Sequence, residues 1–266
     1  MKPRATAIVP ARLGSTRFPR KALAYETGKA LVVHVCERAA VAESVERVVV
    51  ACDAEEIASV VRAAGFEAVL TDPAHENGTS RLAEAAESIG LKQHNLVVNV
   101  QGDEPEIEAS VIDGAVAAAS AEFVVPAFPE MGPRCASVGT VASPFAPGEN
   151  AANPNIVKVV SGLADNKSGV APALYFSRAP IPHDRDGVGG VPPLKHVGIY
   201  AYEVRALRDY TKLTPTPLER AECLEQLRWL EHGLLVRVAI REASHHGIDT
   251  PEQYAAFVER WRAANP

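Results

Sequence analysis

The chain has 266 residues, of which 47% are hydrophobic and 23% charged, and a formal net charge of −6. This length allows one large α/β domain or two small ones, and the acidic balance argues against non-specific nucleic-acid binding, which needs a basic surface. The four cysteines are widely spaced, which argues against a zinc or iron–sulfur site. Since we recognise neither a signal-peptide pattern nor an apolar run of membrane-spanning length, we expect a cytoplasmic protein.

Short apolar runs alternate with helical stretches through the first half of the chain. Continuous β-branched runs are typical of buried strands, and apolar residues spaced three or four apart are typical of amphipathic helices. The alternation predicts a parallel sheet with right-handed crossovers. We predict strands at 5–9, 47–52, 67–70, 95–100 and 122–128, and helices at 29–42, 55–65, 79–90 and 108–120.

The second half loses this rhythm, and its strands are more typical of antiparallel or mixed pairing. Capping boxes predict two helix starts, at Thr216 with Glu219 and at Thr250 with Gln253. Together the two halves predict a single α/β domain over 1–266, with a parallel sheet in the first half and a mixed sheet in the second. In this half we predict strands at 136–142, 156–161, 171–177, 194–202 and 234–240, and helices at 216–233 and from 250.

The stretch "VPARLGSTRFPRKAL" at 9–23 follows the first predicted strand and carries Arg12, Arg17, Arg20 and Lys21. Ligands bind at this edge of open α/β sheets. Neither a P-loop nor a GxGxxG motif is present, yet several cations together with hydroxyl and backbone N–H groups suit a polyphosphate. The alternative is a solvated basic loop, and the position after the first strand favours phosphate.

Carboxylates also follow a predicted strand in "VNVQGDEP" at 98–105, which carries Asp103 and Glu104. Mg²⁺ takes oxygen ligands and typically uses one or two carboxylates plus substrate phosphates. Asp249, just before the Thr250 cap, is a candidate second carboxylate. The alternatives are an ordinary turn at Asp103 and a favourable interaction of Asp249 with the helix N-terminus.

Two further regions carry polar side chains in positions suited to ligands. "HENGTSRLAE" at 75–84 is predicted to feed a helix N-terminus, where N–H groups and the Thr79 hydroxyl can hold a phosphate or a base edge. Arg178, His196, Tyr200 and Tyr202 lie in or beside apolar strands and can contact the hydroxyls and carboxylate of a sugar. A plain N-cap and hydrogen-bonded core residues are the respective alternatives.

Taken together, these stretches resemble the CMP-KDO synthetases, the 3-deoxy-manno-octulosonate cytidylyltransferases. The order of "VNVQGDEP", "LYFSRAPIP" and "GIDTP" makes the resemblance specific, and the matching segments run from residue 8 almost to the end of the chain. The other matching segments are "PARLGSTRFPRKAL", "HENGTSRLAE", "NPNIVKVV", "HVGIYAY" and "PLERAECLEQLR".

The resemblance implies a nucleotidyltransferase fold, Rossmann-like and three-layered with a mixed, mostly parallel central sheet. It implies a nucleotide-binding half at about 1–128 and a smaller mixed-sheet part for sugar binding and dimerisation at about 129–240. It implies a homodimer that converts CTP and KDO to CMP-KDO and pyrophosphate for lipopolysaccharide synthesis, with Mg²⁺ held by Asp103 and Asp249. Lys21, Arg12 and Asp103 are implied to be catalytic. The implied nucleotide contacts are Pro10, Ala11, Arg12, Ser15, Arg17, Lys21, Asp53, His75, Gly78, Thr79 and Gln101. The implied sugar contacts are Gln101, Arg178, His196, Tyr200, Glu225 and Gln226.

Two positions depart from the family pattern: Arg20 stands where a glycine is usual, and Ser80 where an acid is usual. The nearest alternative functions are two other nucleotidyl transfers. One is transfer to another sugar acid, such as 8-amino-KDO or sialic acid, and the other is transfer from UTP to a sugar phosphate. A non-catalytic nucleotide-binding module is a further alternative. The joint presence of Asp103, Asp249 and Lys21 argues against it, because such a module has no chemical need for all three.

Overall fold

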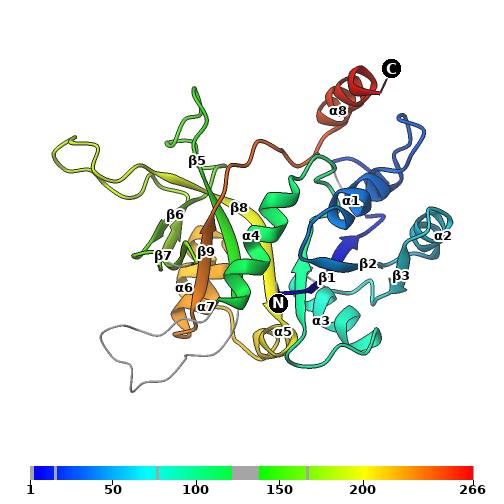
Figure 1. The fold of residues 1–266 in the computed structure, drawn as a ribbon, viewed down its shortest axis with the longest axis horizontal. Helices are drawn as coiled ribbons and strands as arrows, with labels where there is room; N and C mark the ends of the chain where they lie inside the picture. The colour runs from blue at the N-terminus through cyan, green and yellow to red at the C-terminus, as the bar shows by residue number, and fades with distance from the viewer. Residues whose placement is uncertain (1–2, 15–16, 76–77, 122–137, 166–167, 266) are drawn as a thin grey trace.

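A single nine-stranded sheet organises the protein, in the strand order β3-β2-β1-β4-β8-β5-β9-β7-β6 (Figure 1). The computed structural model describes residues 3–14, 17–75, 78–121, 138–165 and 168–265. The strands of the first half are β1 (Ala5–Ala11), β2 (Val45–Cys52), β3 (Glu67–Leu70) and β4 (Leu96–Asn99), and they pair with one another in parallel. The predicted parallel sheet is therefore confirmed here, while the predicted strand at 122–128 lies outside the described residues.

Four helices connect these parallel strands or follow them: α1 (Leu31–Ala40), α2 (Glu55–Ala63), α3 (Gly78–Ser88) and α4 (Ala109–Ser120). Alternate residues of the strands pack to opposite faces of the sheet. Val9 and Val98 pack in a cluster with residues of α1, α2 and α4, whereas Ile8 and Val97 pack in a cluster with residues of α3. Helices on both faces give the predicted three layers.

The strands of the second half join the same sheet. They are β5 (Val138–Pro144), β6 (Lys158–Ser161), β7 (Val170–Ser177), β8 (Leu194–Glu203) and β9 (Val236–Ile240). Strand β8 joins the halves because it pairs antiparallel with both β4 and β5. In this register Tyr200 lies opposite Asn99, so side chains from the two halves meet at the carboxyl end of β4.

The helices of the second half differ from the prediction in two respects. Instead of one helix over 216–233, the structure has α6 (Pro217–Glu222) and α7 (Gln226–Glu231), separated at Cys223, which has a φ of 52°. An unpredicted helix, α5 (Val204–Tyr210), follows β8. The capping box of the last helix, α8 (Pro251–Ala264), is complete, with Thr250 and Gln253 bonded as predicted.

Helix α8 packs over the beginning of α1. Tyr254, Phe257 and Val258 form an apolar cluster with Leu31 and with Ile248 from the preceding linker. The Tyr254 hydroxyl also accepts a hydrogen bond from the Glu26 N–H at 3.0 Å. Within the part of the chain that the structure describes, no helix is long and apolar enough to cross a membrane.

Candidate active site

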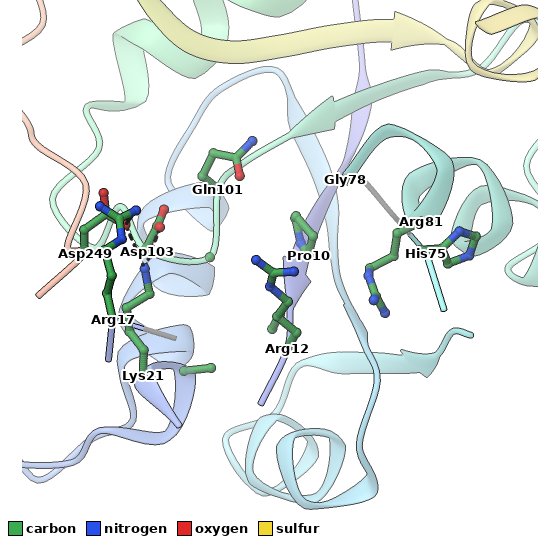
Figure 2. A pocket seen from close by; sticks show the side chains of 13 residues that line it. Pro10, Arg12, Arg17, Lys21, His75, Gly78, Arg81, Gln101, Asp103 and Asp249 are labelled. Carbon is green, nitrogen blue, oxygen red and sulfur yellow. Dashed lines mark hydrogen bonds and ion pairs between the residues drawn. The ribbon is translucent and has the colours of Figure 1, made fainter. Parts of the chain in front are cut away.

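A cavity of about 310 Å³ opens at the carboxyl ends of β1 and β4. Figure 2 shows Arg17, Lys21, Asp103 and Asp249 grouped on one side, with His75 and Arg81 on the other and Arg12 between them. The lining residues are Pro10, Ala11, Arg12, Arg17, Lys21, Ala22, His75, Gly78, Arg81, Gln101, Gly102, Asp103 and Asp249. The structure thus brings together most of the residues that the sequence predicted for nucleotide and metal.

Gly102 allows the loop after β4 to pack directly against the end of β1. A Cβ atom at this position would lie 2.5 Å from the carbonyl oxygen of Pro10, a distance at which the backbone would have to move. Only glycine fits here without displacement. The close approach holds Gln101 and Asp103, the neighbours of Gly102, over the end of β1.

The two predicted metal carboxylates converge on one ammonium group. Lys21 Nζ lies 2.7 Å from Asp103 Oδ2 and 3.5 Å from Asp249 Oδ1, and Arg17 Nη2 lies 3.0 Å from Asp249 Oδ1. Lys21 Nζ also donates to the carbonyl of Ile248 at 2.6 Å. Residues from three distant segments of the chain therefore form one charged cluster on the cavity wall.

This donor set fits a magnesium ion. Asp103 and Asp249 supply carboxylate oxygens, and their common contact with the Lys21 ammonium shows that a single positive charge can interact with both. Among the described residues there is no group of three or more His, Cys, Asp or Glu side chains that could hold a metal by itself. The rest of a coordination shell would therefore come from water and substrate oxygens, as is common for Mg²⁺.

The remaining cations of the cavity differ in their surroundings. Arg12 is exposed and has no hydrogen bond or ion pair to another described residue, so its guanidinium is available to a phosphate. Arg81 is 5% exposed on the opposite wall, where its Nη1 donates to Thr71 Oγ1 at 2.5 Å. No role for Arg81 is predicted from the sequence, although it lies within the "HENGTSRLAE" stretch, because its burial beside the cavity is evident only in the structure.

Arg20 does not line this cavity. Its backbone adopts the left-handed conformation, with φ 59°, that the family glycine would adopt without strain, and its guanidinium pairs with Glu56 of α2. Unlike Arg12, Arg17 and Lys21, Arg20 therefore contacts a carboxylate outside the cavity in this structure. Ser15 lies outside the described residues.

Asp53 and His75 were both predicted to contact the nucleotide, and the structure places them differently. Asp53 Oδ1 accepts a hydrogen bond from the Leu13 N–H at 3.1 Å, so it supports the basic loop without lining either cavity described here. The His75 ring lines the cavity and bonds Ser80 Oγ at 3.0 Å and the carboxylate of Glu84. Glu84, one helical turn after Ser80, thus supplies a carboxylate to this imidazole.

A second cavity of about 360 Å³ adjoins the first and shares Gly78 and Gln101 with it. Five predicted sugar residues, Gln101, His196, Tyr200, Glu225 and Gln226, line it. So does Thr79, predicted for the nucleotide. The other lining residues are Asn99, Val157, Gly198, Tyr202, Tyr210, Cys223, Leu224 and Trp229. The helix break at Cys223 explains why the segment around Glu225 reaches this cavity.

The histidine and the tyrosines of the second cavity are themselves uncharged at neutral pH. Burial lowers the pKa of His196 to about 3 and raises the pKa of Tyr200 and Tyr202 above the usual tyrosine range. His196 Nε2 lies 3.0 Å from Thr140 Oγ1. These groups are suited to hydrogen bonding and ring contacts with a polyhydroxylated ligand, and not to carrying charge.

Arg178, predicted to contact the sugar acid, is not among the residues that line either cavity. Its Nε donates to the carbonyl of Glu222 at 2.7 Å and its Nη1 to the carbonyl of Pro154 at 3.1 Å. Its backbone N–H donates to Glu222 Oε2 at 2.8 Å. In this structure Arg178 therefore fastens the end of α6 to β7, behind the second cavity.

Comparisons with known proteins agree with this geometry. Residues 6–240 match the family model described as cytidylyltransferase. The 3-deoxy-manno-octulosonate cytidylyltransferase of Anaeromyxobacter dehalogenans is 46% identical over 258 residues, covering 96% of this chain and 95% of the relative. That of Syntrophobacter fumaroxidans is 43% identical over 258 residues, covering 96% of each.

A solved structure of a CMP:2-keto-3-deoxy-manno-octonic acid synthetase complexed with CTP superposes with a TM-score of 0.82 at 34% identity, covering 98% of this chain and 99% of that one. The fold, with its cation-lined cavity at the strand ends, is that of a nucleotidyltransferase. More narrowly, the chain belongs to the family of 3-deoxy-manno-octulosonate cytidylyltransferases. The resemblance seen in the sequence is thereby confirmed.

Proposed function

We propose that this protein activates the sugar acid KDO with CTP, giving CMP-KDO and pyrophosphate for lipopolysaccharide synthesis. The observation that carries the proposal is the junction of two chemically different cavities at Gln101 and Gly78. One cavity is lined by cations and two carboxylates, as a nucleoside triphosphate with a metal requires. The other is lined by neutral polar and aromatic groups and by the single carboxylate of Glu225, a lining that suits a sugar.

In the proposed reaction the anomeric hydroxyl oxygen of KDO attacks the α-phosphorus of CTP, and the bond to the bridging oxygen of the β-phosphate breaks. No covalent bond to the protein is needed, so positioning and charge neutralisation supply the catalysis. Arg12 and Lys21 hold the phosphates and neutralise the leaving pyrophosphate. Gln101, which lines both cavities, lies where the two reacting groups meet.

Asp103 and Asp249 are the residues that would hold Mg²⁺. When bound, the ion supplies positive charge next to the α-phosphate and the attacking oxygen. The protein orients the two carboxylates through the hydrogen bonds of the 248–249 segment, and Lys21 reaches both carboxylates and the cavity. His196 stays neutral and contributes hydrogen bonding without transferring a proton.

Pyrophosphate release over a panel of nucleoside triphosphates and sugar acids tests this proposal. We expect turnover with CTP and KDO, and little with UTP and a sugar phosphate. Preference for 8-amino-KDO or sialic acid would assign the protein to one of those reactions instead. Nucleotide binding without turnover on any pair would support the non-catalytic alternative.

We also expect a homodimer. Exposed apolar side chains lie on the β6–β7 hairpin and the β7–β8 connection, where Leu163 is 93% exposed and Val188 79% exposed. Burial of such residues favours association. Sedimentation velocity on the full chain measures the oligomeric state, and a single monomeric species at micromolar concentration would contradict the expectation.

A further inference from the structure

Asn99 is a buried amide on the floor of the second cavity. It is the last residue of β4, is 4% exposed, and lines the cavity together with Tyr200. The sheet register places Asn99 directly opposite Tyr200, and Tyr200 directly opposite Thr140. Opposed residues in neighbouring strands project to the same face, so these three side chains form one polar row across the sheet.

The carboxamide oxygen of Asn99 has no hydrogen-bond partner among the described residues, although it is buried. A buried polar atom without a partner costs free energy, and such atoms are uncommon in folded proteins. Thr140, in the same row, differs from Asn99 because its side-chain oxygen has hydrogen-bond partners. Its hydroxyl is bonded to the carbonyls of Ile199 at 2.7 Å and Val197 at 3.3 Å. The row thus holds one satisfied polar side chain, Thr140, and two with unused polar atoms, the carboxamide oxygen of Asn99 and the hydroxyl of Tyr200, which lacks a partner among the described residues.

We propose that Asn99 is a specificity-determining residue, whose carboxamide oxygen accepts a hydrogen bond from a hydroxyl group of the sugar acid. The inference rests on the proposed assignment of this cavity to the sugar. An amide oxygen accepts and does not donate, so it selects a hydroxyl over the ionised carboxylate of the same substrate. Asn99 lines only the second cavity, whereas Gln101, two residues further along, lines both, so Asn99 contacts a part of the sugar away from the nucleotide.

The test compares Asn99→Leu with Thr140→Val. Both variants replace a buried polar side chain by an apolar one of similar size. Asn99→Leu removes an acceptor that has no partner, so the urea midpoint of unfolding should stay the same or rise. Thr140→Val removes satisfied hydrogen bonds, so its midpoint should fall. In Asn99→Leu the KM for KDO should rise about 10- to 100-fold while the KM for CTP stays within about twofold.

KDO analogues that each lack one hydroxyl identify the contact. The wild-type enzyme should discriminate against one of these analogues, and Asn99→Leu should not discriminate against that same analogue. A loss of stability in Asn99→Leu equal to that in Thr140→Val, with an unchanged KM for KDO, overturns the proposal, because it shows a purely structural amide.

The proposed function can fail separately. If the wild-type protein releases no pyrophosphate from CTP and KDO, the proposed reaction is wrong, and thermal shifts with a panel of hydroxylated sugar acids decide the role of Asn99. A shift in the wild type that is lost in Asn99→Leu supports the role. No shift with any member of the panel overturns it.

Discussion

The backbone N–H of Ile248 donates a hydrogen bond of 2.8 Å to the carbonyl of Asp103. This bond places Asp249 beside Asp103, although Asp103 follows β4 and Asp249 follows β9, far away in the sequence. The linker that carries Asp249 runs from β9 to α8 without regular structure. Its position therefore depends on individual hydrogen bonds, and each of these is a target for mutation.

Glu108 is the main anchor of that linker. It precedes α4 but makes no side-chain capping bond to that helix; instead its Oε1 accepts from the N–H of Ser244 at 2.9 Å and from its hydroxyl at 2.6 Å. Its other oxygen bonds His245. We expect Glu108→Ala to release the linker and raise the Mg²⁺ concentration for half-maximal activity about tenfold, measured by pyrophosphate release and by Mn²⁺ binding in electron paramagnetic resonance.

Glu106→Ala is the matched control for that variant. Glu106 lies two residues away and forms a partly exposed ion pair with Arg260, which contributes little to stability. The metal dependence of this variant should match the wild type. Equal effects of the two substitutions would show that Glu108 has no special role in placing Asp249.

Asp103→Asn should reduce turnover by about a thousandfold or more, because an amide cannot neutralise the charge of a metal ion. The fold should survive, since the Asp103 side chain is 30% exposed and lies outside the apolar clusters. Single-turnover pyrophosphate release and a thermal melt measure the two quantities. A folded variant with a near-wild-type rate would remove Asp103 from the metal site.

Lys21→Ala should lower kcat/KM for CTP about a hundredfold while changing the dissociation constant for KDO by less than about twofold. Lys21 lines the first cavity and is absent from the lining of the second. Lys29→Ala serves as the control, because Lys29 pairs with Glu37 away from both cavities. Steady-state kinetics and KDO titration by calorimetry test the pair, and comparable losses for CTP and KDO would contradict the phosphate role.

Arg20→Gly should be more stable than Arg20→Ala by about 1 kcal/mol. Both variants lose the exposed pair with Glu56, which is worth little, but only glycine adopts a φ near 59° without strain. Urea unfolding measures the difference. Turnover of both should stay within about twofold of the wild type, since Arg20 lies outside the cavity; a large loss of CTP affinity would show that Arg20 contacts phosphate during the reaction.

Because the pKa of His196 is lowered in the folded protein, we expect the stability of the protein to depend on pH. Burial lowers its pKa from 6.5 to about 3, so between these values the unfolded chain binds a proton that the folded protein does not. Stability is therefore lost as the pH falls from about 6.5 toward 3, by up to about 1.4 kcal/mol per pH unit from this group. Urea unfolding at several pH values should show a shallower slope for His196→Gln than for the wild type, and identical slopes would refute the assignment.

Local signals in the sequence predicted most of the helix starts and the parallel half of the sheet. The boxes at Thr216 and Thr250 depend only on residues three positions apart, so the sequence displays them directly. The break at Cys223 depends on distant partners. Arg178, the residue after β7, donates to the carbonyls of Glu222 and Cys223, which an uninterrupted helix would have used internally, and no pattern within 216–233 reveals that competition.

The residues of the candidate site also differ in how far the sequence alone predicts them. Arg12, Lys21 and Asp103 lie next to predicted strand ends, where the topology alone indicates a ligand. Asn99 and Arg81 have no comparable local signal, because an amide in an apolar strand and an arginine in a helix are ordinary until their surroundings are known. Pairing of β8 with β4 creates the surroundings of Asn99, and that pairing joins segments that lie far apart in the sequence.

Asp249 lies near the C-terminal end of the sequence, so it is synthesised after the strands of the sheet. The cations of the basic loop and Asp103 are made early, and the last strand of the sheet ends at Ile240. A growing chain that has reached this strand contains the groups that bind phosphate but only one of the two carboxylates. With the metal role proposed for Asp103 and Asp249, the ability to bind a nucleotide and the ability to consume it would be acquired at different times, and a ribosome-bound or truncated chain would not turn over CTP before the final segment folds over α1.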